Sequence, residues 1–215
     1  MDRNWLLSKI TKGIRHPRLI IFYLMEQLRS YLLEQRKRKV SLIEKNGEIF
    51  YRYKGVLYPD YLNKGNASSF ILSKAMIYCN GKGIDIGAGA WPLPGAIPVL
   101  NEEHQNAYKL DNFLDESLDY IFSSHCLEHL ERWKIALKLW IRKIKPGGIL
   151  FLYLPHKSMR LWNPGGPWAG YIHHKWIPEL KIIKKFLENN GMKIIKYDPD
   201  KDKYWSFYII AKKNI

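Results

Sequence analysis

The chain has 215 residues, 47% of them hydrophobic, and its 35 Lys and Arg against 20 Asp and Glu give a formal net charge of +15. This length and apolar content suit one large domain, or a domain with an extension, around a proper core. The positive charge favours an anionic partner: a membrane surface, a nucleic acid or a phosphorylated substrate. Two cysteines, Cys79 and Cys126, exclude a disulfide framework and a four-cysteine zinc site, so we expect a reducing, cytoplasmic compartment.

Residues 1–40 are strongly basic, with ten Lys or Arg residues against three acidic ones. Pro17 is suited to open a helix, and apolar residues follow it at helical spacing: Ile21, Leu24, Met25, Leu28 and Leu32. The longest apolar run, 19–25, is far below the roughly 20 residues that cross a bilayer, and no cleavage site follows it. Two interpretations stay open: a packing helix with a solvated basic end, or an interfacial helix on anionic lipid.

Strands and helices alternate from residue 81 onward. We expect strands at 83–87, 117–123, 149–155, 192–197 and 205–213, and helices at 128–144 and 178–190. Upstream, residues 46–61 are expected to form a short hairpin or irregular cap. The order predicts an α/β fold with a doubly wound, mostly parallel sheet and an antiparallel C-terminal edge. We divide the chain into a basic helical extension and cap, residues 1–78, and a main domain, residues 79–215.

A glycine turn follows the first strand of the main domain. In Asp85-Ile86-Gly87-Ala88-Gly89, two glycines stand where the backbone bends and approaches a ligand closely. No third glycine follows at the spacing of a pyrophosphate site, and Pro92, Pro94 and Pro98 delay any helix. The turn alone is a weak signal, because such turns occur in many α/β proteins.

Further segments strengthen it: LDESLDYIFSSHCLEHL (114–130), KIKPGGILFLYLPH (143–156) and the terminal strand pair. Together with GIDIGAG they resemble the class I S-adenosylmethionine-dependent methyltransferases of the short methyltransferase-domain type, over about residues 80–213. The resemblance implies a Rossmann-like fold and S-adenosyl-L-methionine as cofactor.

The resemblance also implies roles for particular residues. The methionine part of the cofactor would be held by Asp85, Gly87, Ala88 and Gly89. Asn106 and Ala107 would contact the adenine. The segment Ser123-Ser124-His125 would end the strand that faces the transferring methyl group.

The chain departs from the family's pattern in length. Only 34 residues separate Asp85 from Asp119, so the first helices are expected to be trimmed or replaced by the loop WPLPGAIP (91–98). The family's second strand ends with an acid that holds the ribose. In this chain the corresponding position falls at Val99-Leu100-Asn101, which contains no acid, and the acidic residues Glu102 and Glu103 follow directly after it.

Histidines follow two of the expected strands. In open α/β sheets ligands bind beyond the carboxyl ends of the strands, where His125 and His156 are placed. We predict that both are catalytic, as general bases with pKa values near the ordinary one. His125 and His129 could instead form hydrogen bonds within the strand-to-helix turn. The run 125–129 also matches the zinc-peptidase pattern H-x-x-E-H, which we reject because it straddles a strand end. No metal site is expected.

The loop at 156–175, rich in glycine, proline and tryptophan, is expected to fold over the site as a lid before His173 and His174. Two tryptophans lie in this loop, Trp162 and Trp168, and a third, Trp176, directly follows it. They could be core residues or could form a surface that stacks on a sugar or another flat ring.

Three functional hypotheses follow. The first is a methyltransferase for a hydroxyl or carboxyl of a small molecule or glycan, including a lipid-linked or cell-surface polysaccharide precursor, with residues 1–40 on the inner membrane face. The second is a nucleic-acid methylating or binding protein, prompted by the charge. The third is a non-catalytic protein that kept the fold.

Overall fold

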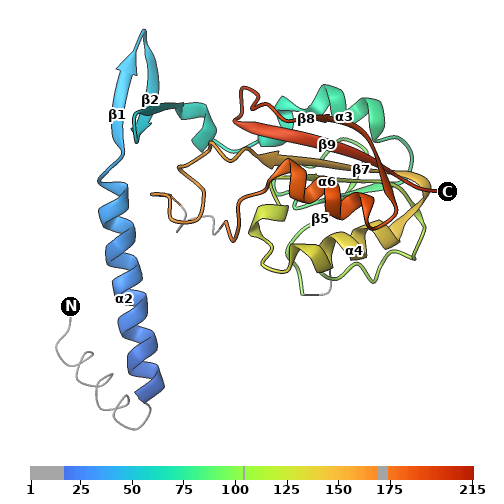
Figure 1. The fold of residues 1–215 in the computed structure, drawn as a ribbon, viewed down its shortest axis with the longest axis horizontal. Coiled ribbons are helices and arrows are strands. Elements are labelled where there is room, and N and C mark those ends of the chain that lie inside the picture. Colours follow the sequence, from blue (N-terminus) through green and yellow to red (C-terminus); the bar gives the residue numbers. More distant parts are fainter. Residues whose placement is uncertain (1–16, 104, 169–173) are drawn as a thin grey trace.

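The computed structural model describes residues 17–103, 105–168 and 174–215 (Figure 1). Its main sheet has six strands in the order β5-β4-β6-β7-β9-β8. Their bounds are β4 Gly83–Ile86, β5 Ile97–Val99, β6 Leu118–Ser124, β7 Ile144–Pro155, β8 Met192–Asp198 and β9 Ser206–Lys213. Strands β5, β4, β6 and β7 are parallel, whereas β9 runs antiparallel to both β7 and β8. The predicted doubly wound sheet with an antiparallel C-terminal edge is confirmed.

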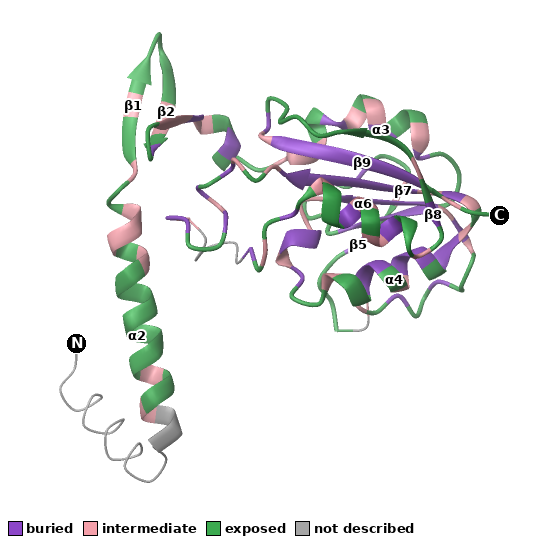
Figure 2. Cartoon of the chain, in the orientation of Figure 1, coloured by how far each residue is buried: buried purple, intermediate pink, exposed green. Residues whose placement is uncertain are grey.

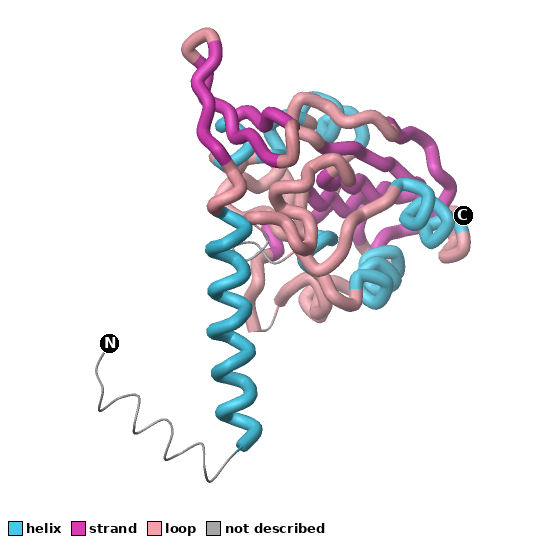
Figure 3. The backbone as a smooth tube through the Cα atoms, turned by 60° about the vertical axis from the view of Figure 1, so that its left-hand side comes forward, coloured by secondary structure: helices cyan, strands magenta, loops and turns pink. Residues whose placement is uncertain are grey.

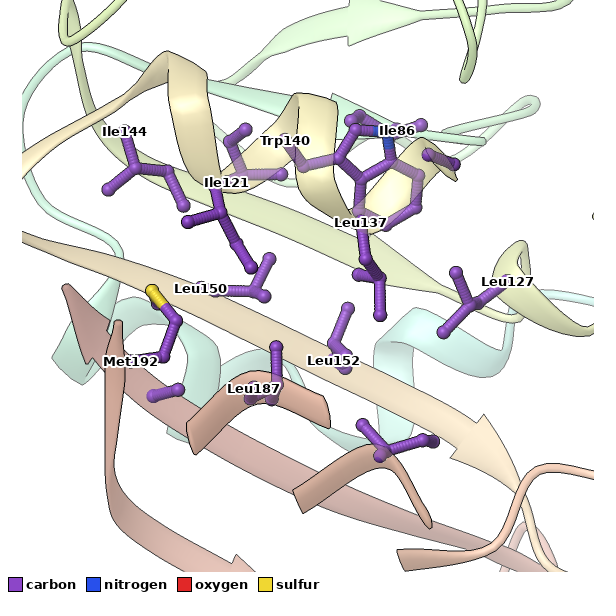
Figure 4. Packing of buried hydrophobic residues seen from close by; sticks show 14 of the residues in the cluster. Ile86, Ile121, Leu127, Leu137, Trp140, Ile144, Leu150, Leu152, Leu187 and Met192 are labelled. Atoms are coloured by element: carbon purple, nitrogen blue, oxygen red, sulfur yellow. The ribbon is translucent and has the colours of Figure 1, made fainter. Parts of the chain in front are cut away.

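Helices cover both faces of this sheet. On one face lie α4 (Trp133–Lys143) and α6 (Leu180–Glu188), and on the other lies α3 (Leu72–Tyr78). Figure 4 shows Leu150 of β7 in the layer between the sheet and Trp140 of α4, both fully buried. Alternate residues of β7 belong to the two hydrophobic clusters, because a strand covered on both faces points successive side chains into opposite cores.

Two local expectations are wrong. The predicted helix at 128–144 is broken: a 3-10 turn spans Leu127–His129, Leu130 is extended (φ −90°, ψ 109°), and α4 begins only at Trp133. The strand expected at 149–155 begins earlier, at Ile144, and within its first part Gly147 has φ +78° and the pairing of β7 with β6 shifts register.

The connections around β5 are short, as predicted. No helix occurs between β4 and β5, and the described residues between β5 and β6 hold only an isolated bridge between Asn106 and Lys109. Strand β5 ends at Val99. The absent helix leaves the carboxyl end of β4 bordered by an irregular loop.

The N-terminal part contains one long helix and a small sheet. Helix α2 (Pro17–Lys37) extends away from the main sheet, and Figure 2 shows it exposed along most of its length. Figure 3 shows the antiparallel sheet β1 (Ser41–Lys45), β2 (Glu48–Tyr53) and β3 (Val56–Pro59) beyond its end. The expected hairpin is therefore present with one additional strand. Within the described residues, no helix has the length and apolar content that a membrane span needs.

Residues before the boundary that we drew at 78/79 pack against the main sheet. Two 3-10 turns, Asp60–Asn63 and Ala67–Phe70, lead from β3 to α3. Tyr58 and Leu62 share a buried cluster with Tyr208 of β9. The segment from β3 to α3 therefore covers one face of the sheet and approaches the site.

Candidate active site

A cavity of about 850 Å³ opens at the carboxyl ends of β4 and β6, within the size range of small-molecule sites. Its floor is the glycine turn after β4. The other walls come from distant parts of the chain, and they include Lys37, Tyr51, Leu62, Asn63, Gly65, Asn66, Ala67, Ser68, Ser124, His125, Glu128, His129, Trp162, Trp168, His174 and Tyr204.

The two glycines of the turn have different roles. Gly87 has φ +82°, and a Cβ there would lie 2.5 Å from the Cys126 Cβ, so only glycine lets the turns after β4 and β6 meet. Gly89 has φ +57°, and a Cβ there would meet nothing within 4 Å. Gly89 therefore leaves one wall of the cavity open to a ligand.

Asp85 offers an unsatisfied carboxylate oxygen at this wall. The residue is 1% exposed, and its Oδ2 accepts a hydrogen bond from the Leu93 backbone N–H at 2.8 Å. Its Oδ1 is buried without a hydrogen-bond partner in the described chain, and burial raises the pKa of the carboxyl to about 6. Such an oxygen suits a ligand's ammonium group. Asp85, Gly87, Ala88 and Gly89 thus fit the amino-acid end of S-adenosylmethionine.

Three other predicted cofactor residues lie outside the cavity lining. Ser123 is buried, and its hydroxyl donates to the Ile86 carbonyl at 2.9 Å, tying β6 to β4. Asn106 donates to the Glu102 carbonyl at 2.9 Å, and the Ala107 carbonyl accepts from the Trp140 indole at 2.8 Å. Their roles toward the cofactor stay predictions.

His125 lies in the cavity in a constrained position. It has φ +50°, and its backbone N–H donates to the Tyr153 carbonyl at 2.9 Å. Its Nε2 lies 2.8 Å from the Ser206 hydroxyl, and its Nδ1 lies 3.5 Å from Glu128 Oε1. Burial, with smaller effects of neighbouring histidines, lowers the pKa of His125 to about 3. The expectation of an ordinary pKa is therefore wrong, and the imidazole is neutral at physiological pH.

His156 is not among the residues that line the cavity. Its Nδ1 lies 2.7 Å from the hydroxyl of Ser158, and its backbone N–H donates to the Trp205 carbonyl. Burial also lowers the pKa of this imidazole. The structure therefore does not bring the two predicted catalytic histidines together in one cavity.

Glu128 is the functional candidate that the sequence reasoning passed over. It is fully buried, it lines the cavity, and burial raises the pKa of its carboxyl to about 8. His129 and His174 line the same region, whereas His173 falls outside the described residues. The H-x-x-E-H run was the available signal, but it does not reveal that His174 completes the cluster.

The tryptophans divide between two roles. Trp162 and Trp168 line the cavity with their ring centroids 4.8 Å apart, and Tyr51 meets Trp168 edge to face at 4.7 Å. Trp176 instead stacks on Trp133 at 4.5 Å, as a packing residue. The central part of the expected lid, 169–173, lies outside the described residues.

Residues 74–152 match the family model of the methyltransferase domain, a range that includes the glycine turn and the His125–His129 segment. A search of curated proteins found no match. The fold is similar to that of a Thermotoga maritima S-adenosylmethionine-dependent methyltransferase, described as a possible histamine N-methyltransferase. The identity is 16%, the TM-score is 0.52, and the alignment covers 72% of this chain and 97% of that one.

It is also similar to a chain from the Haloferax volcanii complex between the Trm112 methyltransferase activator and a methyltransferase. The identity is 11%, the TM-score is 0.53, and coverage is 69% of this chain and 88% of that one. At such identities the likeness concerns the fold. The match over residues 74–152 and this fold identify a methyltransferase domain of the class I S-adenosylmethionine-dependent type. The chain carries that domain, and its cofactor is S-adenosyl-L-methionine.

Proposed function

We propose that this methyltransferase modifies a hydroxyl or carboxyl oxygen of a small molecule or glycan. The supporting observation is that one cavity joins the turn at Asp85–Gly89 to a cluster of nitrogen and oxygen side chains. When bound, S-adenosylmethionine supplies an electrophilic methyl group. An oxygen acceptor fits the opposite wall, because imidazole and carboxylate groups there can orient a hydroxyl and share its proton.

The chain's own residues have three tasks in this proposal. Asp85 and the glycines bind the amino-acid end of the cofactor and fix the donor side. His125, held by Ser206, orients the acceptor oxygen from the other side. The 62–68 segment covers the cavity and excludes water, which would compete with the acceptor.

Aromatic rings support a cyclic acceptor. Tyr51, Trp162 and Trp168 are mutually packed, and all three line the cavity. Their apolar surfaces can lie against the ring of a sugar, while the polar cluster contacts its hydroxyl groups. A glycan precursor would use both surfaces.

The basic helix supports an acceptor held at a membrane. Helix α2 exposes apolar side chains, including Leu24, Met25 and Leu28, and ends in the basic run 36–39. This combination suits the boundary of an anionic bilayer, and we place the enzyme at the cytoplasmic membrane face. Lys37, at the end of the helix, lines the cavity, so a bound helix would hold the site near lipid-linked acceptors.

Calorimetric titration with S-adenosylmethionine and S-adenosylhomocysteine tests the cofactor part of the proposal. Wild-type protein should bind both, Asp85→Ala should bind neither measurably, and Asp111→Ala, which removes an exposed carboxylate outside the cavity, should match wild type. Glycan and lipid-linked acceptors can then be screened by mass spectrometry for added methyl groups. Absence of cofactor binding by folded wild-type protein would refute the proposal.

A further inference from the structure

The Glu128 carboxylate is in an unusual environment for a buried acid. The side chain is 0% exposed, and neither Oε1 nor Oε2 has a hydrogen-bond partner in the described chain. Buried carboxylates are normally hydrogen-bonded, paired with a cation or bound to a metal, because losing water without compensation is costly. The described protein atoms thus leave this carboxyl group able to take a further partner.

Three imidazole nitrogens surround one oxygen of this carboxylate. From Glu128 Oε1 the distances are 3.5 Å to Nδ1 of His125, 3.9 Å to Nε2 of His129 and 3.8 Å to Nε2 of His174. These separations exceed hydrogen-bond lengths of about 2.7–3.2 Å. If hydrogen bonds alone held this cluster together, the distances from Glu128 Oε1 to the imidazole nitrogens would be shorter.

The same separations suit donors around a cation. Donor atoms of Glu128, His129 and His174 all lie within 4.8 Å of one another. A tetrahedral cation about 2.0–2.2 Å from each nitrogen and oxygen donor would place those donors roughly 3.4 Å apart. A contraction of about 0.4–0.5 Å in the two Glu128–histidine pairs, and of at most about 1.4 Å in the widest donor pair, would convert the cluster into a coordination shell.

The backbone fixes the two segments that form the cluster. Glu128 and His129 belong to the 3-10 turn after β6. The backbone N–H of Lys175 donates to the Glu128 carbonyl at 2.8 Å, and the Trp176 indole donates to the Leu127 carbonyl at 2.9 Å. His174 therefore lies on a segment that is attached directly to that turn, as a preformed site requires.

We propose that Glu128, His129 and His174 bind one divalent transition-metal cation in the cavity that the Asp85–Gly89 turn also lines. Two imidazoles and one carboxylate favour zinc, iron, cobalt or nickel over magnesium and calcium, which prefer oxygen ligands. Three protein ligands leave a coordination position open toward the cavity. This proposal departs from the expectation from sequence that the chain has no metal site.

The role of the cation deepens the proposed function and rests on it. A hydroxyl or carboxyl oxygen of the acceptor would occupy the open position, which fixes its place and lowers the pKa of a coordinated hydroxyl. His125, held by Ser206 on its Nε2 side, faces the cluster as a positioning residue.

Metal binding is tested on the full chain after treatment with a chelator. Calorimetric titrations with zinc chloride, cobalt chloride and magnesium chloride are compared between wild type, Glu128→Gln and His174→Ala. The control is His156→Ala, since that histidine does not line the cavity. Wild type and control should bind one equivalent of zinc or cobalt, and both cluster variants should bind at least about tenfold more weakly. Bound cobalt should show the visible absorption of nitrogen and oxygen coordination.

Thermal melting of each variant decides whether a loss of binding is specific. Glu128→Gln replaces the buried acid by a neutral side chain of similar size and is expected to fold, so it remains informative if His174→Ala does not. Absence of zinc and cobalt binding by wild type, or equal binding by folded Glu128→Gln, would overturn the metal site.

A cofactor titration separates this inference from the proposed function. S-adenosylmethionine binding without metal binding would refute the metal site alone. Metal binding without S-adenosylmethionine binding would leave the metal site in place and refute its role toward a methyl acceptor.

Discussion

Asp85 holds the loop that replaces the first helix of the fold: its Oδ2 accepts the Leu93 backbone N–H at 2.8 Å across the proline-containing segment. One carboxylate oxygen thus stabilises the apo structure, while the other, Oδ1, is buried without a partner at the cavity wall. The three prolines do not disable the glycine turn. Pro92 and Pro94 lie in the loop that Asp85 organises, and Pro98 lies in β5.

The first prediction concerns the pH dependence of stability. Burial raises the pKa of the Asp85 carboxyl from 3.8 to about 6. The stability that the protonated carboxyl contributes to the folded state is therefore fully present below the unfolded pKa and is lost as pH rises through about 6. By linkage the wild-type apoprotein should lose about 2–3 kcal/mol from this group between about pH 4 and about pH 7. Urea unfolding of Asp85→Asn at both pH values should lack this loss. An identical decline in both proteins would contradict the assignment.

The second prediction uses the same carboxyl in binding. The ammonium group of the cofactor favours the ionised form of Asp85, so S-adenosylmethionine affinity should increase as pH rises through about 6. Calorimetry across this range measures it. An affinity that is independent of pH from about 5 to about 7 would show that Asp85 does not pair with the ligand.

The third prediction compares three glycines. Gly87→Ala should destabilise the protein strongly, because the new Cβ would meet Cys126 Cβ at 2.5 Å. Gly89→Ala should cost only about 1–2 kcal/mol for its left-handed backbone, yet weaken cofactor binding, since its methyl projects into the cavity wall. Gly95→Ala is the control: it has φ +81° and open space, but it does not line the cavity. Equal cofactor affinity of the Gly89 and Gly95 variants would contradict this role.

The fourth prediction concerns the support of His125. Ser206→Ala removes a fully buried hydroxyl 2.8 Å from Nε2 of the partly buried His125, and should cost about 1–3 kcal/mol of stability. Ser158→Ala removes the equivalent contact from the half-buried His156 and should cost less, because water can replace the hydroxyl there. Chemical unfolding compares the two. A larger loss for Ser158→Ala would exclude this account.

The fifth prediction tests the membrane surface. Leu24→Glu with Leu28→Glu should weaken binding to vesicles of anionic lipid by at least about tenfold, without altering thermal stability, because both side chains are exposed. Gln27→Glu with Ser30→Glu changes the charge equally while keeping the apolar residues, and should weaken binding less. Raising the salt concentration should reduce the wild-type affinity. Failure of the wild type to bind such vesicles would refute the membrane proposal.

The sheet could be predicted because its strands are short, apolar and separated by clear turns. Leu150 and Phe151 illustrate the pattern: neighbours that are both buried, on opposite faces. The start of α4 could not be predicted in the same way. Leu127 and Leu130 have helical spacing, but a single 3-10 turn buries them equally well, and the chain then extends.

The candidate site could be predicted only where its residues are close in sequence. Asp85–Gly89 and His125 could be recognised because they lie at the ends of strands. His174, the 62–68 segment and Lys37 reach the cavity through tertiary packing, which leaves no local pattern. The buried position of Glu128 likewise depends on the distant Lys175 and Trp176.

The wall formed by the 62–68 segment also has a consequence for how the chain folds. The Tyr204 hydroxyl donates to the Gly65 carbonyl, and the Tyr61 hydroxyl donates to the Lys203 carbonyl, contacts that span 139 and 142 residues. Such distant contacts are slow to form and await the last part of the chain to be synthesised. The cavity is therefore completed only when both ends of the domain have met, and we expect the early segment and the final strands to unfold as one cooperative unit.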